Sequence, residues 1–210
     1  MVPLASIVIN AAIPPLAVIA WLWILVGATD SGDLSDKGID SLKYFTVLSN
    51  LFSGVVSGIY LAVCWGSGLQ LPLWLVTLKL VAAASVMLTF LVTAVLLVPM
   101  YGWKSLYRGG NFWLHLVLPL LAAEDCCLFL PLSEVPLSLT LWAMAPTALY
   151  GVFYLARVFM HGAKQGDAEY DFYGFLRWGV KAVPAVLVVM LLLTWGIALV
   201  LRLLGQFAGA

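Results

Sequence analysis

Long, almost uninterrupted runs of apolar residues alternate with short polar segments along the whole chain of 210 residues. A helix that crosses the hydrocarbon core of a bilayer, roughly 30 Å thick, needs about 20 such residues. These runs are too long and too continuously apolar for the strands of a membrane barrel. We therefore predict six transmembrane helices, near residues 2–26, 44–65, 73–98, 111–130, 135–160 and 178–204.

The segments between the apolar runs are too short to hold a separate soluble domain. The longest polar stretches cover only residues 29–43 and 162–177. The first apolar run is too long for a cleavable signal peptide and lacks a basic leader, while Pro14 and Pro15 within it predict a kink or an interrupted helix. The predicted fold class is all-α, with one membrane domain over residues 1–210 folded as a bundle of six helices.

The composition excludes several classes of protein. Hydrophobic residues make up 64% of the chain and charged residues 10%, whereas ordinary globular chains are about 45–50% apolar and about 25% charged. So few charges cannot cover a water-soluble fold of this size, which excludes a cytoplasmic enzyme, a secreted module and a disordered chain. The net charge is zero, so no basic surface is offered to nucleic acid. No metal-ligand spacing or phosphate-binding loop occurs, and we expect no metal and no organic cofactor.

Lysine and arginine are distributed unevenly between the two sides of the predicted bundle. All but two of the ten lie in or beside alternate loops: Lys37, Lys43, Lys104, Arg108, Arg157, Lys164, Arg177 and Lys181. Only Lys79 and Arg202 belong to the other side. Because cytoplasmic loops carry the excess of basic residues, we expect both termini to face outwards, in a bacterial inner membrane.

One face of the second apolar run carries polar side chains. These residues are Thr46, Asn50, Ser53 and Ser57. They are spaced by four, three and four positions, which places them on one face of a helix. Gly54 and Gly58 lie beside them and would allow a neighbouring helix to approach closely. Taken alone, such a stripe is better explained by helix packing, with the hydroxyls bonded back to their own helix.

A hydroxyl and an imidazole are expected at matched depth on the cytoplasmic side of the bundle. Thr46 lies in the first turn of the second run and His115 in the first turn of the fourth. A threonine hydroxyl becomes nucleophilic when a neighbouring base removes its proton, and histidine is the usual base. The alternative is a structural histidine bonded to a backbone carbonyl near Pro119. The pattern by itself leaves both interpretations open.

Other polar residues in the apolar runs are also considered as candidates for a functional site. Asp125 lies ten residues after His115 and could orient an imidazole or carry protons, whereas Glu124 is expected at a helix end near the outer interface. Arg157 belongs to a polar face of the fifth run. It either contacts lipid phosphates at the interface or binds a substrate carboxylate.

Short motifs resemble those of the androgen-induced and androgen-dependent TFPI-regulating family of membrane proteins. The segment 43–46, Lys-Tyr-Phe-Thr, resembles that family's motif at the start of its second helix. The segment 111–119, Asn-Phe-Trp-Leu-His-Leu-Val-Leu-Pro, resembles its Asn-x-x-x-His motif followed by proline. The loop 170–173, Tyr-Asp-Phe-Tyr, is more loosely similar to its Tyr-Pro-Phe-Leu segment, with Asp171 where animal members have proline. Bacterial members share the pattern most closely.

The resemblance implies an intramembrane threonine hydrolase that cleaves esters between fatty acids and hydroxy fatty acids. Thr46 would be the nucleophile and His115 the base, in a site that opens toward the cytoplasmic leaflet and takes a membrane lipid or fatty acid ester. Asn50 would donate to the oxyanion or orient His115, and Asn111, Arg157 and Asp125 are further candidates for substrate or oxyanion binding. Two alternatives are a lipid acyltransferase with the same pair and a non-enzymatic bundle that binds or transports a lipid or small molecule.

Overall fold

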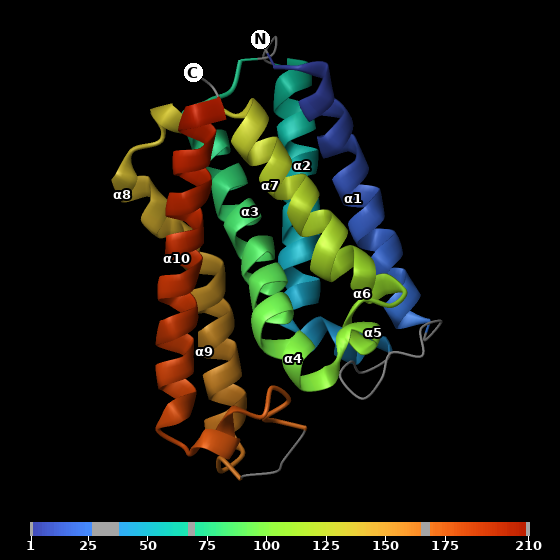
Figure 1. Cartoon of the computed structure of the whole chain (residues 1–210), viewed down its shortest axis with the longest axis vertical. Coiled ribbons are helices and arrows are strands. Elements are labelled where there is room, and N and C mark those ends of the chain that lie inside the picture. The colour runs from blue at the N-terminus through green and yellow to red at the C-terminus, as the bar shows by residue number, and fades with distance from the viewer. Residues whose placement is uncertain (1, 27–37, 67–69, 165–168, 209–210) are drawn as a thin grey trace.

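Six long apolar helices form the molecule (Figure 1), and the prediction of an all-α membrane bundle is confirmed. The computed structural model describes residues 2–26, 38–66, 70–164 and 169–208. Within these residues, the helices that are long and apolar enough to span a membrane are Leu4–Leu25, Phe45–Gly66, Leu73–Met100, Gly110–Phe129, Leu137–Met160 and Ala182–Phe207. The chain is therefore an integral membrane protein.

Two of the spans are single helices with a local change of geometry. The third comprises α3 (Leu73–Val92), a π-helical turn (Thr93–Leu97) and α4 (Val98–Tyr101). After α5 (Trp103–Leu106), the fourth span comprises α6 (Gly110–Phe112), a second π-helical turn (Trp113–Val117) and α7 (Leu118–Phe129). Pro119 has no backbone N–H to give to the carbonyl of residue 115, so the ordinary ladder of hydrogen bonds is broken at this turn.

The other spans differ from the predicted runs mainly at their ends. They are α1 (Leu4–Leu25), α2 (Phe45–Gly66), the pair α8 (Leu137–Thr140) and α9 (Met144–Met160), and α10 (Ala182–Ala208). Helix α1 continues without interruption through Pro14 and Pro15. Helix α10 begins four residues later than the apolar run, because Phe175–Trp178 forms a 3-10 turn and Gly179 follows at φ +94°. A positive φ is disfavoured for residues with a side chain and interrupts a helix.

Helix α3 lies in the middle of the bundle and packs against α2, α7 and α10, while α1 packs against α2 and α7 and α9 packs against α10. Gly54 allows α1 and α2 to approach, since a Cβ at this position would lie 3.4 Å from the Cα of Pro14. Gly58 has no comparable neighbour. The predicted small-residue contact is thus made by one of the two glycines.

The outer faces of the spans are apolar, as contact with lipid requires. Large hydrophobic side chains are exposed on each of them, for example at Leu22, Val55, Trp74, Leu120, Val152 and Leu192. Both termini lie at one end of the bundle (Figure 1), and the opposite end holds α4, α5 and the segment that precedes α10. The polar residues singled out near the starts of α2 and of the fourth span lie at this opposite end.

Candidate functional site

A cavity at the end opposite the termini is lined by polar residues from several elements. Its volume is about 260 Å³. We call it the polar cavity, because its lining includes Thr46, Asn111, His115, Asp171, Tyr173 and Arg177. Residues 46 and 115, which the sequence placed at matched depth on two different helices, therefore face one shared space.

Thr46 lies in the first turn of α2 and is half-buried. Its backbone carbonyl accepts hydrogen bonds from Ser49 and Asn50. Within the described residues its hydroxyl has no hydrogen-bond partner, so the bond back to its own helix that a packing role predicts is not made. The hydroxyl is free to take part in contacts with a molecule in the cavity.

His115 is buried in the π-helical turn, and its ring is fixed from one side. Nδ1 lies 3.0 Å from the backbone carbonyl oxygen of Leu106. A carbonyl oxygen can only accept, so Nδ1 carries a hydrogen and the neutral imidazole keeps its lone pair on Nε2. The ring of Tyr107 meets the imidazole edge-on, with centroids 6.5 Å apart. The bond to a backbone carbonyl is what the interpretation as a structural histidine predicts, although the carbonyl belongs to α5 and not to the helix break at Pro119.

No hydrogen bond joins Thr46 to His115 in the described part of the chain. Both residues line the polar cavity. In many enzymes without substrate, the hydrogen bond between nucleophile and base is long and tightens only when substrate binds.

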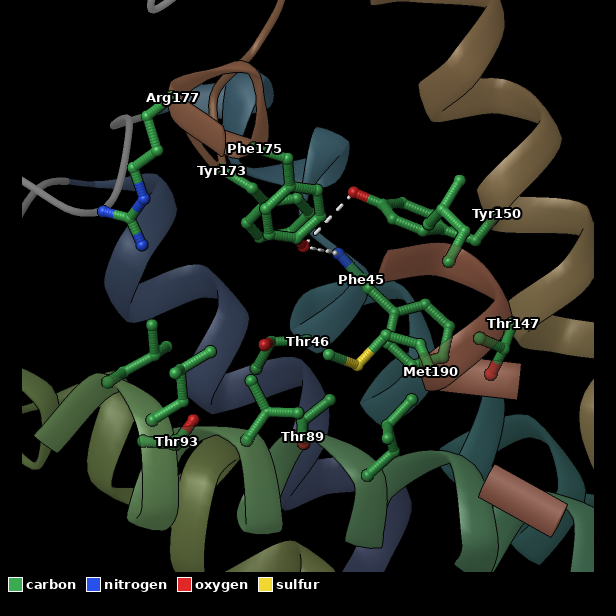
Figure 2. A pocket seen from close by; sticks show the side chains of 15 residues that line it. Phe45, Thr46, Thr89, Thr93, Thr147, Tyr150, Tyr173, Phe175, Arg177 and Met190 are labelled. Carbon is green, nitrogen blue, oxygen red and sulfur yellow. Dashed lines mark hydrogen bonds between the residues drawn. The ribbon is translucent and has the colours of Figure 1, made fainter. Parts of the chain in front are cut away.

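A second cavity meets the polar cavity at Thr46. Its volume is about 120 Å³, and most of its lining is aliphatic or aromatic. We call it the apolar cavity. Figure 2 shows Thr46 between Tyr173 on one side and Thr89 and Thr93 of the third span on the other. The far wall includes Leu187 and Met190 of α10. Thr46 thus lines both a polar space and a lipid-like space.

Asn50 connects the two helices that carry Thr46 and His115. Its side chain is fully buried, and Nδ2 donates to the carbonyl of Thr46 at 2.8 Å and to the carbonyl of Leu114 at 3.0 Å. Both amide hydrogens are therefore used, and Asn50 lines neither cavity. Of its two expected roles, this geometry corresponds to positioning of the residue next to His115 and not to donation to an oxyanion.

Asn111 lies in the fourth span, one turn before His115. It is largely buried and lines the polar cavity. Its side-chain amide makes no hydrogen bond with any other described residue. Its donors therefore remain available to a substrate oxygen.

Arg157 lies away from both cavities. Its guanidinium lies over the rings of Phe153, Tyr170 and Phe172, and Nη2 donates to the carbonyl of Glu169 at 3.4 Å. The arginine that does line both cavities is Arg177. From the sequence alone, Arg177 serves only as one of the basic residues that predict the orientation of the bundle.

Asp125 lies at the other end of the bundle. One carboxylate oxygen is 2.9 Å from Lys79 Nζ, and the carboxylate also accepts hydrogen bonds from Ser6 and Asn10. Asp125 is not part of the lining of either cavity. The structure therefore separates it from Thr46 and His115.

The segment before α10 lines both cavities and contains residues that hydropathy and helical periodicity do not single out. Asp171 is buried, and its carboxylate accepts hydrogen bonds from the Tyr154 hydroxyl and from the backbone N–H groups of Phe175 and Leu176, the latter two at 2.9 and 2.8 Å. This caps the 3-10 turn that presents Arg177. The only available signal was the aromatic-rich Tyr-Asp-Phe-Tyr segment.

Tyr173 attaches this segment to the first turn of α2. Its hydroxyl oxygen accepts a hydrogen bond from the backbone N–H of Phe45 at 3.0 Å (Figure 2). The hydroxyl of Tyr150 donates to the carbonyl of Lys43 at 2.6 Å and lies 3.2 Å from the Tyr173 hydroxyl. Burial raises the pKa of Tyr173. The phenol is therefore neutral at ordinary pH. Because the Tyr150 hydrogen goes to the Lys43 carbonyl, the single hydrogen of Tyr173 is the one that can bridge the two hydroxyls, and it serves a substrate only when it turns away from Tyr150.

The described residues contain no cluster of three or more histidine, cysteine or acidic side chains that could hold a metal ion. Comparison with protein-family models, with curated proteins and with solved structures found no match to this chain.

Proposed function

We propose that this protein is an intramembrane hydrolase of lipid carboxylic esters, with Thr46 as the nucleophile and His115 as the general base. The single observation that carries the proposal is the shared polar cavity. Thr46 and His115 both line it, and a lipid-like cavity opens from the same threonine.

The proposed reaction proceeds in two steps. Nε2 of His115 removes the hydroxyl proton of Thr46 while Oγ1 attacks the ester carbonyl carbon. The tetrahedral intermediate collapses, the bond to the alcohol oxygen breaks, and His115 returns the proton to that oxygen. Water, deprotonated by His115, then attacks the acyl-threonine, which releases the fatty acid and restores the threonine.

The orientation of the imidazole supports this assignment. The bond from Nδ1 to Leu106 leaves the lone pair on Nε2, which is the arrangement that a base requires. An analogous contact to a carboxylate or carbonyl orients the base in other hydrolases. Asn50 then acts as a positioning residue, since it links the carbonyls of Thr46 and Leu114.

The negative charge of the tetrahedral intermediate needs hydrogen-bond donors that are already in place. Two groups of the polar cavity meet this need. The Tyr173 hydroxyl lies 3.0 Å from the backbone nitrogen of Phe45, the neighbour of Thr46. The amide of Asn111 lines the same cavity one turn before His115. We assign Tyr173 and Asn111 to the oxyanion.

A hydrolase probe of the fluorophosphonate type, applied to purified protein in detergent, tests the proposal together with hydrolysis of a panel of lipid esters. Thr46→Val and His115→Gln should each lose labelling and lower turnover by about 10³-fold or more, because nucleophile and base act as a unit. Thr77→Val is the matched control, since Thr77 lies in α3 and bonds back to the carbonyl of Leu73. It should behave as wild type.

Two results would decide against the proposal. Wild-type protein that neither labels nor hydrolyses any ester would contradict an enzymatic role and leave a lipid-binding or transport bundle. An acyl-threonine that is consumed faster by added lysolipid than by water would identify an acyltransferase. Size-exclusion profiles of all variants show whether a loss of turnover arises from misfolding.

We further propose that the site faces the cytoplasmic leaflet of a bacterial inner membrane, with both termini outside. The basic side chains Lys43, Lys104 and Arg177 lie in segments at the site end of the bundle, as the positive-inside rule requires for a cytoplasmic face. In a variant without native cysteines, Gln70→Cys should react with a membrane-impermeant maleimide in intact cells. Lys104→Cys should react only after permeabilisation, and the reverse pattern would invert the topology.

A further inference from the structure

The site has two compartments, and the residues common to both define where an ester would lie. The polar and apolar cavities share four lining residues, Thr46, Leu97, Tyr173 and Arg177. An ester also has two limbs, an acyl chain and an alcohol, joined at the carbonyl that the nucleophile attacks. With Thr46 at the junction, one limb can enter each cavity.

The apolar cavity suits the acyl chain. Apart from a few hydroxyl groups its walls are aliphatic and aromatic, with Leu88, Val92 and Leu96 on one side and Leu187 and Met190 on the other. Such walls offer a hydrocarbon chain the same kind of van der Waals contacts that the bilayer gives it. The alcohol limb is then directed into the polar cavity.

Arg177 lies at the mouth of both cavities with its charge available. Its guanidinium is exposed and lies 4.3 Å from the ring centroid of Trp178, and Nη2 is 3.8 Å from Met100 Sδ. It forms no ion pair with any carboxylate in the described parts of the chain. Neither neighbour neutralises it, so the cation is held in place but not paired.

The acidic residue in the lining of the polar cavity, Asp171, is already engaged in hydrogen bonds. The carboxylate of Asp171 accepts two backbone N–H groups and the hydroxyl of Tyr154. These bonds shape the turn that carries Arg177, which begins after Gly174 at φ +66° and ends before Gly179 at φ +94°. The turn therefore presents the guanidinium at a defined position at the cavity mouth.

We propose that Arg177 binds an anionic group on the alcohol limb of the substrate, either a carboxylate or a phosphate, while the acyl chain occupies the apolar cavity. This proposal rests on the hydrolase function above and names the class of ester that the site selects. The guanidinium suits both anions, because its N–H groups match two oxygens of a carboxylate or phosphate at once. Attack by Thr46 then leaves the acyl group on the threonine, and the anionic alcohol, protonated by His115, departs through the polar cavity before water releases the fatty acid.

Matched esters test the proposal. One pair is a fatty acid ester of a hydroxy fatty acid as the free acid and as its neutral methyl ester. A second pair is lysophosphatidylglycerol and a monoacylglycerol, with and without phosphate. A neutral p-nitrophenyl ester measures the basal hydrolase activity. If wild-type protein does not hydrolyse this ester, the proposed function itself is contradicted, and not the role of Arg177.

The readout is the ratio of kcat/KM for the anionic ester over its neutral partner. Arg177→Gln should lower this ratio by about 10- to 100-fold, the effect of one lost charge-assisted hydrogen-bonding pair, and Arg177→Lys should restore part of it. Arg108→Gln removes another exposed arginine at the same end that lines neither cavity, and should leave the ratio unchanged.

The two pairs distinguish the two sources of negative charge. A loss confined to the carboxylate pair identifies a carboxylate, and a loss confined to the phosphate pair identifies a phosphorylated alcohol. A ratio that Arg177→Gln leaves unchanged for both pairs would overturn the proposal, whether neither member is affected or both lose activity equally. Either result would make Arg177 a residue that contacts bulk lipid at the interface.

Discussion

Lys79 and Asp125 form an ion pair in the interior of the bundle, with Nζ and Oδ2 2.9 Å apart and both side chains buried. They come from α3 and α7. Asn10 of α1 bonds to both partners, donating to Asp125 at 2.9 Å and accepting from Lys79 at 2.6 Å. The ring of Tyr60 lies 5.4 Å from the ammonium. Four helices are thus joined through one charge-neutral cluster.

We expect the loss of either charge alone to destabilise the fold. A buried charge without its partner is expensive, so Lys79→Met or Asp125→Leu should each lower the free energy of unfolding by about 3–5 kcal/mol. The double variant should recover much of that loss, because it leaves no unpaired charge. Thermal unfolding in detergent, followed by size-exclusion chromatography, measures the three variants. A double variant as unstable as the sum of the single ones would contradict the pairing.

Asn50→Ala should impair catalysis through position and not through substrate contact. The variant loses the bonds from α2 to the carbonyls of Thr46 and Leu114, so we expect kcat to fall about tenfold or more with KM little changed. Ser49→Ala is the matched control, since among the described residues the Ser49 hydroxyl bonds only to the Thr46 carbonyl. Steady-state kinetics on one ester separates the two variants. An equal loss of kcat in Asn50→Ala and Ser49→Ala would show that the bond from Asn50 to Leu114 has no particular role in catalysis.

Tyr173→Phe tests the proposed donor to the oxyanion. The variant keeps the aromatic packing and loses only the hydroxyl, which should lower kcat by about 10²-fold if the group serves the transition state. Tyr150→Phe removes the neighbouring hydroxyl, which is already engaged with the Lys43 carbonyl, and should have a smaller effect. Single-turnover acylation rates measure the difference. A larger loss of acylation rate in Tyr150→Phe than in Tyr173→Phe would contradict the assignment of Tyr173 as the donor to the oxyanion.

Leu187→Ala should change the preferred acyl chain. Leu187 lines the far wall of the apolar cavity, and a shorter side chain there leaves space for additional methylenes. Each added methylene should improve kcat/KM of the variant by up to about fourfold until the space is filled. A series of p-nitrophenyl esters of increasing chain length measures the shift. An unchanged chain-length optimum would show that the acyl chain does not enter this cavity.

The helices themselves were predictable because the bilayer imposes a simple rule on sequence. Every backbone polar group in hydrocarbon must be bonded within its own segment, so long apolar runs become helices. Helix α10 is displaced by four residues at both ends, and at its start Gly179 at φ +94° ends the preceding turn before the helix begins at Ala182. Hydropathy alone does not detect such a turn.

The candidate site was only partly predictable. Thr46 and His115 could be selected because polar side chains are rare in apolar runs, and helical periodicity gave their approximate depth. Asp125 is a candidate on the same ground, but it lies in a different cluster, with Lys79. The sequence indicates the depth of a residue along its helix and does not show which neighbouring helix the side chain faces. Arg177 and Tyr173 lie outside the apolar runs, where polar residues are common and their presence does not indicate a functional site.

The sequence by itself determined the solvent in which the chain folds, the number of spans, and the residues whose polarity demands an explanation. Each of these depends on local properties, namely the hydropathy of a segment and its periodicity. Only the tertiary structure decided which of those residues share a cavity, which are joined as an ion pair, and that the turn before α10 brings Tyr173 and Arg177 to Thr46. These relationships depend on how helices far apart in the chain pack together, and one-dimensional periodicity does not encode that packing.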